Sequence, residues 1–239
     1  MSLRLSVVLP CYNEAANLPA LLERYRGAQP AGLDWELVLV QNGSTDSSDQ
    51  VMDALLARPE HAFARKVTVE VNQGYGYGMA QGLAAARGEA LCISHADMQC
   101  DAKDAFDAYA LWAAQTDRER VLVKGRRQRR ALSQQVVTWG MSAVATLALG
   151  RRLSDINAQP KLFSRALLDH LAAMPTGFEF DVYVLYSALA SGGRLQTLDV
   201  HFGERLHGES KWAAHTFLRW RTIARVFWYI LTLRYRVNA

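Results

Sequence analysis

The sequence has few cysteines and no long apolar run, and both absences narrow the possible classes of protein. Its three cysteines, Cys11, Cys92 and Cys100, are an odd number without paired metal-ligand spacing. This argues against a disulfide framework or a zinc site and fits a reducing cytoplasm. Because no run of about 18 apolar residues occurs, we predict no membrane-spanning segment. The first residues lead directly into a predicted strand, so we expect no signal peptide.

A strong excess of one charge is also missing. The chain has 239 residues with 27 lysines and arginines against 23 acidic residues, a formal net charge of +4. The basic stretch at residues 125–130 could contact RNA, but no RNA-recognition motif accompanies it, so we expect no nucleic-acid partner. The length suits one large domain with an ample core.

Strand and helix patterns alternate through the first half of the chain. Apolar, β-branched runs predict strands at residues 5–9, 35–40, 67–71 and 90–94, and helical periodicity follows each of them. Such alternation predicts an α/β fold with a parallel, doubly wound sheet. Further along we expect a short strand at 121–124, a helix at 133–149, helices from about 165 and 178, and a last strand at 195–202.

A glycine-rich stretch follows the third predicted strand. Gly74 and Gly76 have dinucleotide-fold spacing, but Met79 stands where the third glycine should be. The loop also follows the third strand instead of the first. We therefore interpret it as a tight turn that lets a helix pack closely, not as a pyrophosphate cradle.

Polar side chains gather where the fourth predicted strand ends. On an extended backbone His95, Asp97 and Gln99 would all point to one side. An imidazole, a carboxylate and a carbonyl oxygen that converge there could hold a divalent cation. The alternative is a strand end with solvated polar groups.

Four segments, in order, carry a family resemblance. The chain resembles family 2 inverting glycosyltransferases of the GT-A fold, and within them the branch like dolichol-phosphate mannose synthase, which loads a sugar onto a polyprenyl phosphate. The resemblance implies a mainly parallel sheet with helices on both faces. It divides the chain into a catalytic domain at 1–211, with a nucleotide-binding half at 1–101 and an acceptor half at 102–211, and a C-terminal amphipathic tail at 212–239. The segments are Val8 to Glu14, Asn42 to Asp46, Ala96 to Gln99, and Arg205 to Lys211.

The resemblance also implies a donor site for a nucleotide sugar. Asp97 and Gln99 would hold Mg²⁺ or Mn²⁺ on the donor diphosphate, with Asp97 counted among the catalytic residues. His95 stands where the family usually has an aspartate, and it is either a direct ligand that favours Mn²⁺ or an outer-shell contact. The remaining donor-site residues line the nucleotide pocket: Pro10, Tyr12 (alternatively packed against the first helix), Glu14, Asn42 and Ala96.

The acceptor side is implied by acidic and basic positions in the second half. Asp155 would act as a base or position the acceptor, or else only cap a turn with Asn157. Arg127 would bind the acceptor phosphate with support from Lys124 and Arg130. Three further residues would meet the diphosphate or the lipid phosphate from a loop: Arg205, Ser210 and Lys211.

Asn42 bears on the nucleobase, because the family usually has an aspartate there. An amide has an acceptor and a donor, which together match cytosine, whereas uracil could still bond to the amide oxygen alone. A cytidine, uridine or guanosine donor therefore stays open.

The tail mixes aromatic residues with arginines, which suits a helix in an anionic membrane interface. We therefore expect a cytoplasmic protein that is peripheral at the inner face of the plasma membrane. Alternatively the tail packs on the catalytic domain or on a second subunit of a homo-oligomer. The residues concerned include Phe217, Trp220, Arg225, Phe227, Ile230, Leu231 and Arg234.

The leading functional hypothesis is transfer of a sugar from a nucleotide-activated donor to a polyprenyl phosphate. A second hypothesis keeps the fold but uses a soluble or polysaccharide acceptor. A third is a catalytically weak nucleotide-sugar binding protein, suggested by Asn42 and His95 in place of acidic residues.

Overall fold

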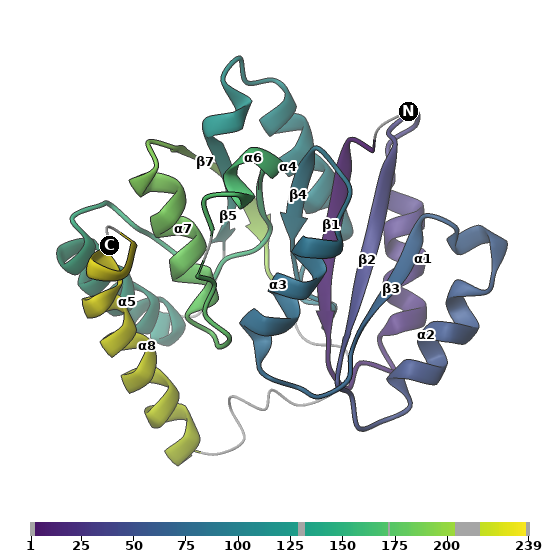
Figure 1. Cartoon of the computed structure of the whole chain (residues 1–239), viewed down its shortest axis with the longest axis horizontal. Coiled ribbons are helices and arrows are strands. Elements are labelled where there is room, and N and C mark those ends of the chain that lie inside the picture. The colour runs from purple at the N-terminus through teal and green to yellow at the C-terminus, as the bar shows by residue number, and fades with distance from the viewer. Residues whose placement is uncertain (1–2, 129–131, 172, 204–215, 238–239) are drawn as a thin grey trace.

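The computed structural model describes residues 3–128, 132–171, 173–203 and 216–237. Strands and helices alternate through these ranges (Figure 1), as the hydrophobic patterns predict. Short 3₁₀ turns lie at Pro59–His61 and Arg118–Arg120. The strands are β1 (Leu5–Cys11), β2 (Trp35–Asn42), β3 (Ala64–Val69), β4 (Ala90–Ile93), β5 (Val121–Gln128), β6 (Lys161–Ser164) and β7 (Arg194–His201). The helices are α1 (Leu18–Ala28), α2 (Ser48–Leu56), α3 (Tyr75–Ala85), α4 (Ala102–Ala113), α5 (Leu132–Leu149), α6 (Arg165–Leu168), α7 (Phe180–Ala190) and α8 (Thr216–Val237).

The strands form one seven-stranded sheet in the order β3-β2-β1-β4-β6-β5-β7. Neighbouring strands are parallel except at β6, which runs antiparallel to both β4 and β5. The carboxyl ends of the six parallel strands therefore meet at one edge of the sheet, called here the carboxyl edge. Strand β6 starts at the same edge, where Lys161 lies opposite both Ile93 and Lys124. The mainly parallel, doubly wound sheet of the sequence prediction is confirmed.

Two predictions about strands need correction. The sequence analysis missed β6, because four residues between a turn and a helix are too few to show a period. The predicted strand at 121–124 is too short, since β5 pairs with β7 from Val121 through Gln128. The basic residues Arg126 and Arg127 are thus held in a strand that neighbours β7, not in a loop.

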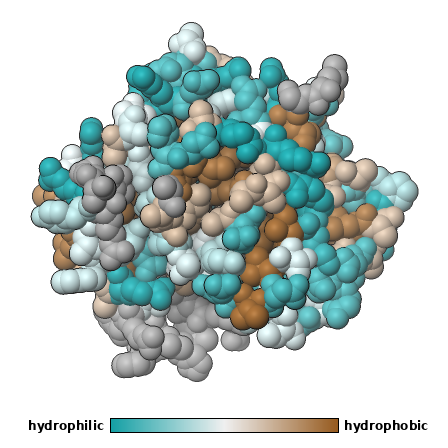
Figure 2. Space-filling model, viewed as in Figure 1, coloured by the Kyte–Doolittle hydropathy of each residue, from teal (hydrophilic) through white to brown (hydrophobic). Residues whose placement is uncertain are grey.

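Helices cover both faces of the sheet because successive strand residues point to opposite sides. Val8 joins a core cluster with residues of α3, α5, α7 and α8. Its neighbours Val7 and Leu9 join the other cluster, which contains residues of α1, α2 and α4. On the face drawn in Figure 2 most of the surface is hydrophilic, and hydrophobic residues gather near its middle.

Helix α3 packs very close to the sheet because glycines face it. A Cβ atom on Gly82 would lie 2.4 Å from the Val8 side chain and 2.6 Å from that of Val40. At Gly78 the added atom would lie 2.8 Å from the Asn42 side chain. This confirms that the glycine-rich stretch serves close helix packing.

Helix α8 packs against α5 and α7. Its inner residues Ile230 and Leu233 are fully buried in the core, and Arg225 forms an ion pair of 2.5 Å with Glu179 beside α7. Helix α8 therefore packs on the rest of the fold along one side. Within the described ranges, no helix combines the length and apolar character needed to span a bilayer.

Candidate active site

Loops at the carboxyl edge bring the first two sequence motifs together. The backbone N–H of Thr45, after β2, donates to Asn13 Oδ1 after β1 at 2.8 Å. The N–H of Glu14 donates to Ser48 Oγ at 2.8 Å. Segments that lie about 30 residues apart in the chain thus form one polar surface.

The third motif lies beside them at the end of β4. Asp97 is buried to 8% exposure and His95 is half-buried. The backbone turns at Met98, whose φ is +66°, so the assumption of an extended chain from His95 to Gln99 is wrong. The Gln99 amide donates to the Gly203 carbonyl at 3.2 Å, which ties this loop to the segment after β7.

Backbone strain concentrates at these loops. In the described ranges the non-glycine residues with positive φ are Asn13 at 58°, Met98 at 66° and Asp155 at 44°. Such conformations are uncommon outside glycine and cluster at functional sites. Each of the three falls in a loop that the sequence analysis assigned to binding or catalysis.

Arg127 and Asp155 form a buried ion pair, with side chains only 10% and 11% exposed. Arg127 Nε donates to Asp155 Oδ1 at 3.0 Å, and the Arg127 backbone N–H donates to Oδ2 at 2.9 Å. The guanidinium carbon also lies 5.4 Å from the centre of the Phe202 ring. Burial acts to raise the pKa of Asp155, but the bonds and charge of Arg127 outweigh it and lower that pKa. A carboxylate with a lowered pKa is a poor base, so this geometry favours the positioning role of Asp155.

A second buried polar network was missed by the sequence analysis because it begins at β6. Lys161 Nζ lies 2.5 Å from Asp181 Oδ1 at the start of α7, with both side chains almost fully buried. The Gln159 amide donates to the same oxygen at 3.0 Å and lies 3.3 Å from the Tyr75 hydroxyl. This network lies at the carboxyl edge, where β6 runs between β4 and β5.

His95 lies beside this network, with the centre of its ring 6.0 Å from the centre of the Tyr75 ring. Burial lowers the pKa of His95, against the opposing charges of Asp97 and Asp181. The imidazole is therefore neutral near pH 7, the form in which histidine binds metals.

The described residues fit one side of a divalent-metal site. They contain no group of three or more His, Cys, Asp and Glu side chains that could hold an ion alone. Asp97 and His95 offer one carboxylate and one neutral imidazole at the carboxyl edge. Sites of this kind use one or two protein ligands and complete the shell with substrate phosphates and water.

The remaining predicted donor residues differ in their exposure. Pro10, Tyr12 and Glu14 are half-buried, and Ala96 is buried. Asn42 is only 2% exposed, and its Nδ2 donates to the Gly74 carbonyl at 3.2 Å. Its Oδ1 is buried and has no hydrogen-bond partner among the described residues. This side chain therefore fastens β2 to the start of α3.

Four predicted phosphate-binding residues lie outside the described residues: Arg130, Arg205, Ser210 and Lys211.

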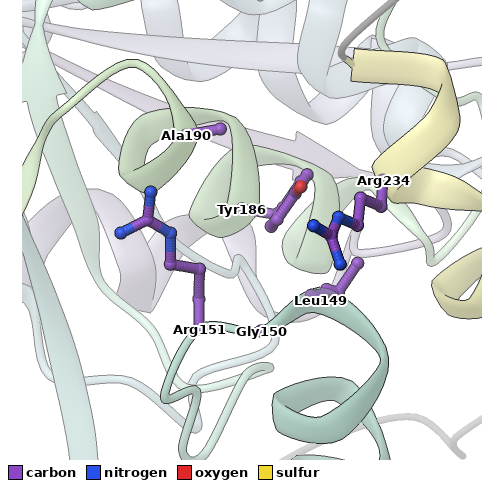
Figure 3. Close-up of a pocket in the computed structure, with 6 residues that line it drawn as sticks. All are labelled: Leu149, Gly150, Arg151, Tyr186, Ala190 and Arg234. Carbon is purple, nitrogen blue, oxygen red and sulfur yellow. The ribbon is translucent and has the colours of Figure 1, made fainter.

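A separate cavity of about 270 Å³ lies between α5, α7 and α8. In Figure 3 Arg151 and Arg234 lie on opposite sides of Tyr186. Both arginines are exposed, and neither forms an ion pair within the part of the chain that the structure describes. The other lining residues are Leu149, Gly150 and Ala190.

The glycosyl transferase family 2 model matches residues 6–152. An uncharacterised glycosyltransferase of Mycobacterium tuberculosis is 32% identical over 214 residues, covering 86% of this chain and 88% of that protein. Undecaprenyl-phosphate 4-deoxy-4-formamido-L-arabinose transferase of Shewanella sediminis is 27% identical over 210 residues. That match covers 87% of this chain but only 61% of the longer relative.

Solved structures show the same fold. Glucosyl-3-phosphoglycerate synthase from Mycobacterium tuberculosis with Mn²⁺, UDP and phosphoglyceric acid superposes with a TM-score of 0.72 at 22% identity. That match covers 97% of this chain and 78% of the synthase. A complex of the synthase with Mg²⁺ and UDP gives a TM-score of 0.69 at 21% identity, covering 97% and 79% of the two chains.

Proposed function

Because the chain belongs to glycosyl transferase family 2, we propose that it transfers a sugar, with inversion, from a nucleotide diphosphate to a polyprenyl phosphate. The observation that carries this proposal is the similarity along 87% of the chain to an undecaprenyl-phosphate sugar transferase. The buried cations at the carboxyl edge support it, since they suit a phosphate-bearing acceptor.

The chemistry required of the protein is mainly positioning. A phosphate oxygen that attacks the anomeric carbon is already ionised near neutral pH, so a strong general base is not needed. The lowered pKa of Asp155 agrees with this, and its bonds to the Arg127 guanidinium would hold that group in place for the acceptor phosphate. Asp97 and Gln99 would hold Mn²⁺ or Mg²⁺, with His95 as a further ligand or an outer-shell contact, and the ion would neutralise charge on the leaving diphosphate.

The donor base follows from the contacts of Asn42. The side chain is only 2% exposed, its nitrogen donates to the Gly74 carbonyl and its Oδ1 is buried, so neither group of the amide is open to a base. The argument for cytosine depended on both groups of this amide being available to the base. This removes the support for a cytidine donor, and we propose a uridine or guanosine diphosphate sugar.

The outer surface of α5 and α8 suits a membrane interface. Neither helix contains an acidic residue, and aromatic and aliphatic side chains are exposed on both. Arg151 and Arg234 line the cavity beside these two helices. Their positive charges suit the anionic headgroups of a membrane. We propose peripheral binding through this surface, at the inner face of the plasma membrane. The exposed apolar residues are Trp139, Leu147, Phe227, Trp228, Leu231 and Tyr235.

A direct assay tests the transfer. Purified protein with Mn²⁺ and radiolabelled UDP- or GDP-sugars is offered undecaprenyl phosphate in detergent, or a soluble phosphate acceptor such as phosphoglyceric acid. We expect label in the lipid fraction. Label only in the soluble product would favour the second hypothesis of the sequence analysis. If the protein neither transfers the sugar nor hydrolyses the donor, the result would favour the third hypothesis, a nucleotide-sugar binding protein.

A further inference from the structure

Two lysines lie side by side in the interior of the sheet. Lys124 of β5 and Lys161 of β6 are directly opposite each other in the antiparallel register, so their side chains point to the same face. Both are 0% exposed. Lysine is almost never fully buried unless it is paired, so each needs a counter-charge.

Only one of them has a carboxylate partner. Lys161 forms its 2.5 Å ion pair with Asp181. Lys124 donates to the Gly125 carbonyl at 2.8 Å, and it has no carboxylate within ion-pair distance among the described residues. The nearby Asp155 is already bound by Arg127.

Lys124 nevertheless keeps its charge at neutral pH. Burial, followed by the charge of Lys161, lowers the pKa of Lys124 to about 8. Arg127 and Arg126 act in the same direction, and Asp155 opposes them. The folded protein therefore holds a buried cation that is costly to its stability, close enough to Arg127 and Asp155 for their charges to act on it.

We propose that Lys124 is a positioning residue for phosphate binding. A phosphate bound at Arg127 supplies the negative charge that Lys124 lacks within ion-pair distance among the described residues. This inference rests on the proposed function, because it assigns the phosphate to the acceptor. Lys124 is fully buried, so it acts through the field at Arg127 and not by contact. The fold is destabilised in return for affinity, as is common at functional sites.

The test uses Lys124→Met, which keeps the length of the side chain and removes the charge. Over several ångströms, at an effective dielectric constant of about 20, the loss of one charge should weaken phosphate binding about tenfold. We expect this change in the calorimetric Kd for farnesyl phosphate and in KM for the acceptor. The KM for the donor and kcat should stay within about threefold. The melting temperature should rise by roughly 2–6 °C.

Lys161→Met is the matched control, from the same rung of the sheet and the same depth. It leaves Asp181 buried without its cation, so it should lower the melting temperature. A purely structural role for Lys124 would give the same sign in both variants. The inference is overturned if Lys124→Met melts lower than the wild type or fails to fold, or if it binds farnesyl phosphate as tightly. Transfer activity is read separately: a wild type that binds farnesyl phosphate in a Lys124-dependent way but transfers no sugar refutes only the proposed function.

Discussion

The molecule carries basic residues in two regions that differ in burial and in ion pairing. At the carboxyl edge, Lys161 and Arg127 are buried and paired with carboxylates, and Lys124 is buried beside them. On the α5–α8 side, Arg151 and Arg234 are exposed around a cavity and form no ion pairs with described residues.

The difference matters because burial changes what a charge can recognise. Buried pairs have fixed geometry and are little screened by salt, so they suit one phosphate in one position. Exposed, unpaired arginines sense the summed potential of a surface and weaken as salt is added. Under the proposed function, the carboxyl edge would bind a single ligand and the α5–α8 side would meet an extended anionic surface.

The largest effect is expected at the carboxyl edge, from Asp97→Ala. Removing the carboxylate should reduce transfer by about a thousandfold, or roughly 4 kcal/mol in the transition state, because the metal loses its charged ligand. In the wild type Mn²⁺ should support turnover at least as well as Mg²⁺, given the imidazole of His95. The measurement is initial rate with each metal, with circular dichroism to confirm folding. Undiminished activity of the variant in the presence of a chelator would refute the metal assignment.

The next effect concerns stability against pH. The pKa of Lys124 falls from its ordinary 10.5 to about 8 on folding, so between these values the unfolded chain binds more protons. The free energy of unfolding attributable to Lys124 therefore rises with pH across this window, by on the order of 3 kcal/mol. Urea titrations at pH 7 and pH 10 should show that Lys124→Met is the more stable protein at pH 7 and loses most of that advantage at pH 10. A constant difference would mean that folding does not lower the pKa of Lys124.

Asn42→Asp should have a smaller effect, again because charge at the carboxyl edge needs a partner. The new carboxylate would face the Gly74 carbonyl without a donor, which should cost about 2 kcal/mol of unfolding free energy. Asn72→Asp is the control, because Asn72 Oδ1 accepts from the Gly74 N–H at 2.8 Å and a carboxylate can do the same. Equal urea midpoints for the two variants would contradict this account of Asn42.

Much of the carboxyl edge could be predicted from sequence because its motifs follow strands with clear patterns. The placement of Asp97, Asn13 and Glu14 depends on strand ends, and those were predicted to within two residues. The pairing of Lys161 with Asp181 could not be predicted, since it joins the missed strand β6 to a helix 20 residues later. The bond between Asn42 and Gly74 was also hidden, because nothing in the local pattern shows which backbone group a buried amide will meet. The hydrophobic pattern of the sequence predicts where strands and helices lie. Which buried polar groups pair with each other depends on tertiary contacts, which that pattern does not show.

The smallest effect, and the most sensitive to salt, is expected on the α5–α8 side. An arginine near an anionic surface contributes about 1 kcal/mol, or about fivefold in binding. Arg151→Gln and Arg234→Gln should therefore each weaken sedimentation with phosphatidylglycerol vesicles about fivefold, and leave binding to phosphatidylcholine vesicles unchanged.

Arg152→Gln is the matched control, since Arg152 is exposed beside Arg151 but does not line the cavity. Deletion of α8 would be a poor substitute, because Ile230 and Leu233 belong to the core. At 0.5 M salt the difference between the variants and the wild type should vanish, because the Debye length falls to about 4 Å. The tenfold effect of Lys124→Met on phosphate binding should persist there, since a buried charge is little screened. If instead both effects faded together, the two regions would not differ in the way that their burial predicts.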